Sequence, residues 1–201
     1  YLVNDQAVGI YAAAARLSEV WYLLPVAIIT GYFPQLLAAK QEGPEDYNRT
    51  LQQLCDLLLC AGFAAAVFIT LTADYLVPLL YGQAYIESVE VLVIHVWAGV
   101  FFFTSALVSR WLLIEDALIA AFYVQAAGAV ANVGFNFWFI PKYGVVGAAI
   151  ATLISGFVSG YLVMLFHPRL YPMGKIISWS FCLPLRLVYR FFTDSKQRLS
   201  K

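Results

Sequence analysis

The sequence predicts an all-α polytopic membrane protein, and two observations lead to that prediction. Of the 201 residues, 62% are hydrophobic and 12% are charged, whereas a soluble domain carries about 25% charged residues. Several apolar runs also exceed the roughly 18 residues that indicate a membrane-spanning helix. A water-soluble globule of this composition would lack polar surface. We therefore expect five transmembrane helices, followed by an interfacial C-terminal helix.

Two of these helices are joined by a very tight corner. The run 117–140 holds 24 residues without an acidic or basic side chain, and the run 145–166 holds 22. Each is long enough to cross a hydrocarbon core of about 30 Å at about 1.5 Å per residue. Pro141 is expected to end the incoming helix, and Gly144 has a backbone that can reverse direction. So short a connection predicts two antiparallel neighbours.

Three further helices are expected before this corner, at about 9–39, 54–79 and 88–113. Residues 1–8 are interpreted as the end of a truncated earlier helix and an outer loop, and the polar segment 40–49 as a loop between helices. The last apolar run, 176–185, has ten residues and is too short to span. Residues 172–201 are therefore predicted to form an interfacial segment and a basic cytoplasmic tail.

The distribution of lysine and arginine predicts the orientation of the chain. With five crossings, ten of these residues fall on one side of the membrane. Lys142 alone falls on the other side, with Arg16 below that surface. Basic residues concentrate in cytoplasmic loops. The side with ten is therefore predicted to be cytoplasmic, and the C-terminus with it.

Three stretches resemble one family of membrane transporters. They are VGIYAAAARLSE at 8–19, LYGQAY at 80–85 and NFWFIPKYGVVGAAIAT at 136–152. In this order and spacing they resemble the C-terminal lobe of bacterial polysaccharide flippases of the O-antigen type. These flippases belong to the superfamily of multidrug, oligosaccharide-lipid and polysaccharide exporters. The corner motif is fairly specific for the superfamily and less specific for the substrate.

The resemblance implies a dozen helices in two six-helix lobes around a central cavity. It also implies transport of undecaprenyl-diphosphate-linked oligosaccharide across the bacterial inner membrane by alternating access. On that mapping the chain holds the last five helices and departs from the family in lacking the N-terminal lobe and the first helix of the C-terminal lobe. We therefore expect either a fragment or a chain that needs the missing lobe as a partner. Other polysaccharide-assembly proteins are further expected partners, besides the bilayer and the lipid-linked glycan.

Amide side chains form a polar face on the fourth expected helix. Gln125, Gly128, Asn132 and Asn136 follow one another at spacings of three, four and four residues. Amides inside a membrane need hydrogen-bond partners. The face is expected either to bond neighbouring helices or to form a cavity wall that donates to sugar hydroxyls.

Charged and titratable residues give two more site hypotheses. Arg16 and Glu19 share a helix face, where they either form a mutual ion pair or leave Arg16 to meet an anionic diphosphate or acidic sugar. Glu90 and His95 lie near the outer end of the third helix. Because histidine titrates near neutral pH, these two residues are candidates for proton coupling. The alternative for His95 is a hydrogen-bonded interfacial side chain.

Small residues recur every four positions on the fifth expected helix. Gly144, Ala148, Thr152, Gly156 and Gly160 fall on one face and include a GxxxG pair. Helices in lipid associate through close backbone approach. This face is therefore predicted to be a packing seam, which would also serve as a sliding surface in alternating access.

The sequence gives no reason to expect an enzyme, a cofactor, a metal site or nucleic-acid binding. The three cysteines show no metal-ligand spacing, and no nucleophile elbow or phosphate-binding glycine loop is present. The alternatives to a lipid-linked oligosaccharide flippase are a cation-coupled multidrug exporter of the same superfamily, a membrane enzyme of polysaccharide assembly and a non-transporting scaffold.

Overall fold

The computed structural model describes residues 5–183 and Arg186, and over that part of the chain it contains helices and no strand. Four helical units are long and apolar enough to cross a membrane: Asp5–Glu42, Pro44–Tyr81, Ser88–Ile114 and Leu118–Phe166. The prediction of an all-α polytopic membrane protein is therefore confirmed. The elements are α1 (Asp5–Glu19), a 3-10 turn (Val20–Tyr22), α2 (Leu23–Glu42), α3 (Pro44–Tyr81), a 3-10 turn (Gln83–Tyr85), α4 (Ser88–Ile114), α5 (Leu118–Phe157), a π turn (Val158–Leu162), α6 (Val163–Phe166) and α7 (Tyr171–Phe181).

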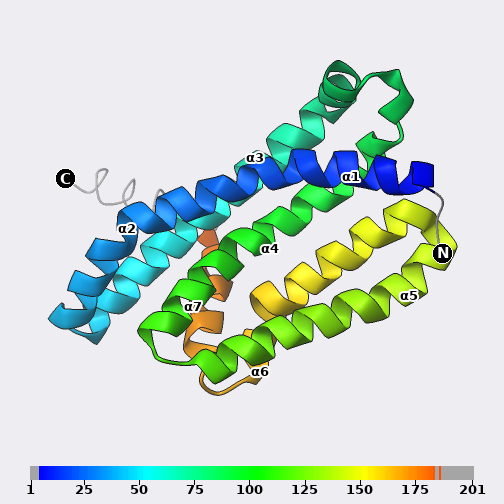
Figure 1. Cartoon of the computed structure of the whole chain (residues 1–201). Helices are drawn as coiled ribbons and strands as arrows, with labels where there is room; N and C mark the ends of the chain where they lie inside the picture. The colour runs from blue at the N-terminus through cyan, green and yellow to red at the C-terminus, as the bar shows by residue number, and fades with distance from the viewer. Residues whose placement is uncertain (1–4, 184–185, 187–201) are drawn as a thin grey trace, which may run out of the picture.

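The fourth unit is folded back on itself at Gly144, so that its two arms lie antiparallel (Figure 1). Gly144 has φ 56° and ψ −133°, a conformation that a side chain would strain. A Cβ on Gly147 would collide with the carbonyl oxygen of Phe139, so the returning arm can start this close only with glycine there. The incoming arm passes through Pro141, contrary to the expectation that it would end there. The reversal takes place at Gly144 alone.

The polar segment 40–49 is not the loop that the sequence predicts. α2 continues to Glu42, α3 begins at Pro44, and Gly43 between them has φ 142°. Proline suits the first position of a helix, where its missing N–H would have no intrahelical partner. Glu45 and Asp46 in the first turn favour the positive end of the helix dipole. The acidic residues thus start a helix rather than form a loop.

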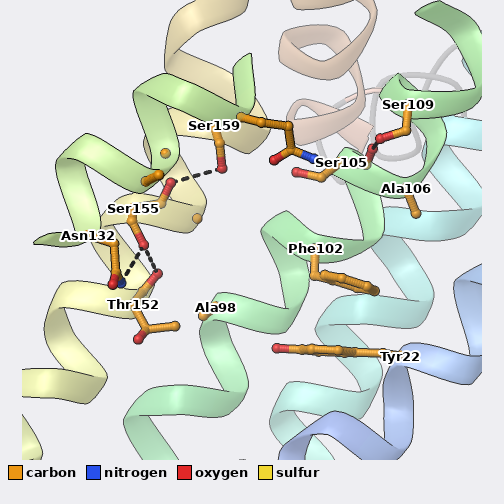
Figure 2. Close-up of a pocket in the computed structure, with 14 residues that line it drawn as sticks. Tyr22, Ala98, Phe102, Ser105, Ala106, Ser109, Asn132, Thr152, Ser155 and Ser159 are labelled. Atoms are coloured by element: carbon orange, nitrogen blue, oxygen red, sulfur yellow. Dashed lines mark hydrogen bonds between the residues drawn. The ribbon is translucent and has the colours of Figure 1, made fainter. Parts of the chain in front are cut away.

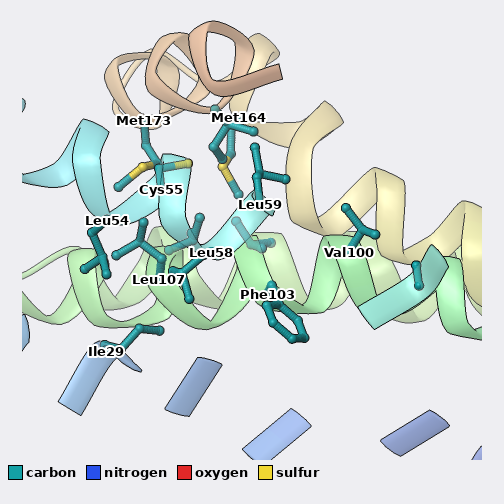
Figure 3. Close-up of a cluster of buried hydrophobic side chains, with 14 of the residues drawn as sticks. Ile29, Leu54, Cys55, Leu58, Leu59, Val100, Phe103, Leu107, Met164 and Met173 are labelled. Carbon is teal, nitrogen blue, oxygen red and sulfur yellow. The ribbon is translucent and has the colours of Figure 1, made fainter. Parts of the chain in front are cut away.

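The core of the bundle lies between α3 and α4 (Figure 3). Leu54 and Leu58 of α3 and Phe103 and Leu107 of α4 are each at most 1% exposed. Gly62 brings the two backbones close, because a Cβ there would lie 3.3 Å from the Cα of Val100. In lipid such close packing is the main source of helix association.

α7 is a short helix that packs against α3 and α6. The side chains of Met173 and Ile177 on α7 are fully buried. A Cβ on Gly174 of the same helix would lie 3.1 Å from the carbonyl oxygen of Met164. α7 has eleven residues. The predicted basic tail at 187–201 lies outside the described residues.

Hydrogen bonds join α7 to the third and fourth turns of α3. The Nε2 of Gln52 donates to the Oδ1 of Asp56 at 2.9 Å, to the carbonyl oxygen of Ile176 at 3.2 Å and to the Oγ of Ser180 at 2.6 Å. Asp56 in turn accepts from the guanidinium of Arg186 at 2.7 Å. These bonds hold α7 across α3.

At the same end of the bundle, Lys40 joins the end of α2 to the end of α4. Its Nζ donates to the carbonyl oxygen of Ile114 at 2.8 Å and lies 3.0 Å from the carboxylate of Glu115. The hydroxyl of Tyr47, in the first turns of α3, donates to the same carboxylate at 2.9 Å. Three helix ends therefore meet at Glu115.

Candidate functional site

A polar cleft of about 510 Å³ opens between α4 and the two arms of the α5 hairpin (Figure 2). None of the fourteen described residues that line it is acidic or basic, and eight of them carry a hydroxyl or amide group. The lining residues are Tyr22, Ala98, Phe102, Ser105, Ala106, Ser109, Gln125, Gly128, Ala129, Asn132, Thr152, Ser155, Gly156 and Ser159.

The hydroxyl groups of the cleft donate mostly to the carbonyl oxygens of their own helices. Ser109 donates to Ser105 at 2.9 Å, Ser155 to Thr152 at 2.9 Å and Ser159 to Ser155 at 3.0 Å. A hydroxyl that donates its proton in this way keeps two lone pairs with which to accept. The walls therefore present oxygen atoms that can accept hydrogen bonds from a bound molecule.

Amide groups from the outgoing arm of the hairpin supply donors. The Nδ2 of Asn132 donates to the Oγ of Ser155 at 3.2 Å and so joins the two arms. The Nδ2 of Asn136 donates to the Oδ1 of Asn132 at 2.9 Å, but Asn136 does not itself line the cleft. Gln125 lines it with an exposed side chain. The amide face was predicted either to bond a neighbouring helix or to form a cavity wall. Asn132 does both, because it bonds the returning arm and lines the cleft, whereas Gln125 only lines the cleft.

An aromatic pair lies on the α4 side of the cleft. The rings of Tyr22 and Phe102 are stacked with centroids 3.8 Å apart and an interplanar angle of 14° (Figure 2). Tyr22 comes from the 3-10 turn between α1 and α2, so this turn contributes to the cleft. Flat aromatic faces are surfaces on which apolar faces of a ligand can pack.

Arg16 and Glu19 lie outside this cleft on the exposed face of α1. The expected alternative of a mutual ion pair is absent, because the ion pairs among the described residues are Lys40–Glu115, Arg49–Asp46 and Arg186–Asp56. The cation of Arg16 is therefore not neutralised by Glu19. Its role in substrate binding stays a prediction.

The structure separates Glu90 from His95. Glu90 is exposed, whereas His95 is 4% exposed and its Nδ1 lies 2.7 Å from the Oγ of Ser18 on α1. The ring of Tyr11 contacts the imidazole edge-on at a centroid distance of 5.7 Å. The hydroxyl of Tyr11 then lies 3.2 Å from the Oγ1 of Thr152, which lines the cleft. Tyr11 thus connects His95 to the cleft, and Glu90 takes no part in this arrangement.

The predicted small-residue face on the returning arm lies partly against α4. A Cβ on Gly156 would lie 3.5 Å from the Cβ of Phe101, and one on Gly160 would lie 2.8 Å from the carbonyl oxygen of Phe101. Gly144 is at the corner, where it turns the chain. Ala148 accepts a hydrogen bond from the Oγ1 of Thr152 at 3.0 Å. Thr152 and Gly156 also line the cleft, so the predicted packing face and the cleft share residues.

The serines of the cleft and its aromatic pair were not predicted from the sequence. Ser105 and Ser109 lie four apart on α4, and Ser155 and Ser159 lie four apart on the returning arm. The cleft serines could have been predicted from their spacing, because each pair lies inside an apolar run and places two hydroxyls on one helix face. Nothing in the sequence placed Tyr22 opposite Phe102, since these residues are far apart along the chain.

The family model "Lipid II flippase MurJ" matches residues 2–192, which is nearly the whole chain. The chain belongs to the lipid II flippase MurJ family. This membership confirms the predicted resemblance to flippases at the level of the family. The O-antigen type and the position in a C-terminal half stay predictions.

Two curated relatives of the chain are also known. "Probable flippase AglR" of Haloferax volcanii is 29% identical over 176 residues, which cover 84% of this chain and 36% of that protein. "Capsular polysaccharide biosynthesis protein CapF" of Staphylococcus aureus is 20% identical over 171 residues, covering 85% of this chain and 43% of that protein. The chain thus spans less than half the length of these relatives. No solved structure matches it significantly.

Proposed function

We propose that this MurJ-family chain is part of a flippase that moves a lipid-linked saccharide across the bacterial inner membrane by alternating access. The observation that carries the proposal is the uncharged, hydroxyl-rich cleft between α4 and the α5 hairpin, inside a bundle of membrane-spanning helices. A polar cavity among apolar helices is costly unless it meets a polar ligand or water. A saccharide, with many hydroxyl groups and apolar ring faces, fits such a lining.

The cleft residues would contact the sugar rather than the phosphates. Amide donors on Gln125 and Asn132 and the acceptor oxygens of the serines match the alternating donors and acceptors of sugar hydroxyls. The stacked pair of Tyr22 and Phe102 offers a face for the apolar side of a pyranose ring. Arg16, unpaired with Glu19 and exposed on α1, is the cation proposed for the anionic diphosphate.

The second candidate function is a cation-coupled exporter of small lipophilic drugs. Such substrates are commonly cationic and would be expected to meet acidic or extensively aromatic walls. The cleft has neither, since its described lining is uncharged and rich in serine. The lining therefore favours a saccharide. We further propose the O-antigen type of substrate, a cytoplasmic C-terminus and a proton-coupling role for His95, whose contact with Ser18 joins α4 to α1.

The test is transport of a fluorescent undecaprenyl-diphosphate-linked oligosaccharide in proteoliposomes that hold the whole protein in which this chain occurs. Gln125→Leu removes a cleft amide that makes no hydrogen bond within the described structure, so folding should be preserved. We expect transport to slow about threefold to tenfold, the effect of one lost hydrogen bond. The matched control is Gln53→Leu, an exposed glutamine of α3 outside the cleft. Equal rates for the two variants would contradict the role of the cleft.

The phosphate contact is tested separately. Arg16→Ala should abolish most transport of the diphosphate-linked substrate, whereas Arg16→Lys, which keeps the charge, should retain a measurable share. Unchanged export by Arg16→Ala would exclude this residue as the phosphate ligand without affecting the assignment of the cleft.

A further inference from the structure

A second groove, of about 550 Å³, lies along α7, away from the polar cleft. Its lining includes Gln52 of α3, Leu165 of α6, and Tyr171, Lys175, Trp179 and Cys182 on or next to α7. No residue lines both this groove and the polar cleft. The groove combines apolar and aromatic walls with one basic side chain.

The cation of Lys175 is unpaired within the described part of the chain. The ion pairs there are Lys40–Glu115, Arg49–Asp46 and Arg186–Asp56, and none includes Lys175. Its ammonium lies 4.7 Å from the ring centroid of Tyr171, so the aromatic ring directs it along the groove wall. By contrast, the neighbouring Arg186 is held by Asp56 at 2.7 Å and lies over the ring of Trp179. Among the described residues, the groove therefore has one basic side chain that is in no ion pair.

The position of the groove suits the headgroup level of a membrane. α7 follows a helix that ends at Phe166 and packs on the third and fourth turns of α3, in the half of the bundle where most described lysines and arginines lie. Tyr171 and Trp179 are exposed on α7 by 46% and 56%. Exposed tyrosine and tryptophan favour the membrane–water boundary. The basic end is predicted to be cytoplasmic, and anionic lipids concentrate in the cytoplasmic leaflet.

We propose that the α7 groove binds an anionic glycerophospholipid, with the lipid phosphate at the ammonium of Lys175 and an acyl chain along Leu165 and Ile176. Charge complementarity selects an anionic over a zwitterionic headgroup, because none of the described residues that line the groove is acidic. The apolar walls select a lipid over free phosphate. The saccharide carrier is disfavoured, since its sugar would need a polar lining that lies in the other cleft. A lipid held here would anchor α7, and through Gln52 the start of α3, at a fixed depth.

The test uses quenching of tryptophan fluorescence by brominated phospholipids in mixed vesicles that contain the whole protein. Brominated phosphatidylglycerol should quench more effectively than brominated phosphatidylcholine, and Trp179→Phe should remove that difference. Lys175→Gln should lower the preference for phosphatidylglycerol about fivefold, the effect of about one cation near an anionic membrane surface. Lys175→Arg should retain it.

The chain contains a matched control for Lys175. Lys142 is also exposed and lies over an aromatic ring, 5.2 Å from the centroid of Trp138, but at the opposite end of the hairpin and outside the groove. Lys142→Gln should leave the lipid preference unchanged. An equal loss in both lysine variants would indicate a general charge effect and would overturn the assigned site.

Competition distinguishes the occupants of the groove. Inorganic phosphate at millimolar concentration should not relieve the quenching, and undecaprenyl diphosphate should not displace brominated phosphatidylglycerol at equimolar amounts. Relief by either compound, or a preference that survives Trp179→Phe, would overturn the proposal. The measurement needs no transport, so its failure and the failure of the proposed flippase activity are separate results.

Discussion

α4 packs on two sides in two different ways. Towards α3 it presents Phe103 and Leu107, which are at most 1% exposed and belong to the same buried cluster as Leu54 and Leu58 (Figure 3). Towards the α5 hairpin its neighbours are glycines, serines and an open polar cleft. We call these the aliphatic seam and the small-residue seam. The first is filled by large side chains, and the second leaves a cavity of about 510 Å³.

The two seams are expected to differ in rigidity. The aliphatic seam gains its stability from dense van der Waals packing, which tolerates little displacement. The small-residue seam depends on close backbone contacts at Gly156 and Gly160 and on single hydrogen bonds, such as the one from the Oγ1 of Thr104 on α4 to the carbonyl oxygen of Gly160 at 3.3 Å. Because each of these contacts contributes little, we expect the hairpin to move against α4 at a lower free-energy cost than α3 does.

The largest expected effect is on the aliphatic seam. Phe103→Ala removes a fully buried ring and should lower the free energy of unfolding in detergent micelles by about 3 kcal/mol. The control is Phe122→Ala on α5, whose ring is 69% exposed and should cost well under about 1 kcal/mol. If both variants lose the same stability, the α3–α4 contact is not the stable core that we describe.

An intermediate effect is expected on the small-residue seam. Gly160→Ala places a methyl group 2.8 Å from the carbonyl oxygen of Phe101 and 3.0 Å from the Oγ of Ser105. The hairpin must shift, at a cost of about 1–2 kcal/mol. Gly134→Ala has nothing within 4 Å of the new methyl group and should be neutral or slightly stabilising. Thermal unfolding in the same detergent compares them, and a Gly160→Ala variant as stable as Gly134→Ala would show that this seam is loosely packed.

The smallest expected effect is on the hydrogen bond between α1 and the hairpin. Tyr11→Phe removes the 3.2 Å contact with Thr152 and should cost about 0.6 kcal/mol, the average for such bonds in membrane proteins. Hydrogen exchange should rise in the returning arm and remain unchanged in α3. Tyr123→Phe, on an exposed tyrosine of α5, is the control. A uniform rise over α3 and the hairpin would remove the distinction between the two seams.

Much of the architecture could be predicted from the sequence because composition and run length directly limit what can cross a membrane. The prediction at Gly144 identified the reversal point, but Pro141 was wrongly expected to end the helix. A helix can pass a proline when the lost hydrogen bond falls near its end, as it does here. The prediction of a loop at 40–49 was also wrong. Its acidic residues and Pro44 suit the first turn of a helix, and α3 begins there.

The candidate site was less predictable. Gln125 and Asn132 were identified from their spacing on one helix, and both line the cleft. Ser105 and Ser159 were missed, because a single serine in an apolar run is equally compatible with packing and its neighbours across helices are unknown. Glu90 and His95 were grouped by sequence proximity, yet five residues along a helix put them on different faces, one exposed and one buried against Ser18.

The amino-acid sequence was sufficient to identify a set of apolar helices and a reversal near Gly144, and it predicts that most basic residues lie on one side of the membrane. These properties follow from the local chain, because hydrophobic length, glycine and charge act without distant partners. The three-dimensional packing was needed to show which polar residues face a common cleft and that Arg16 is not paired with Glu19. It also showed that, among the described residues, Lys175 of α7 is in no ion pair while Arg186 is held by Asp56. Those outcomes depend on which helices become neighbours, and packing in three dimensions sets that.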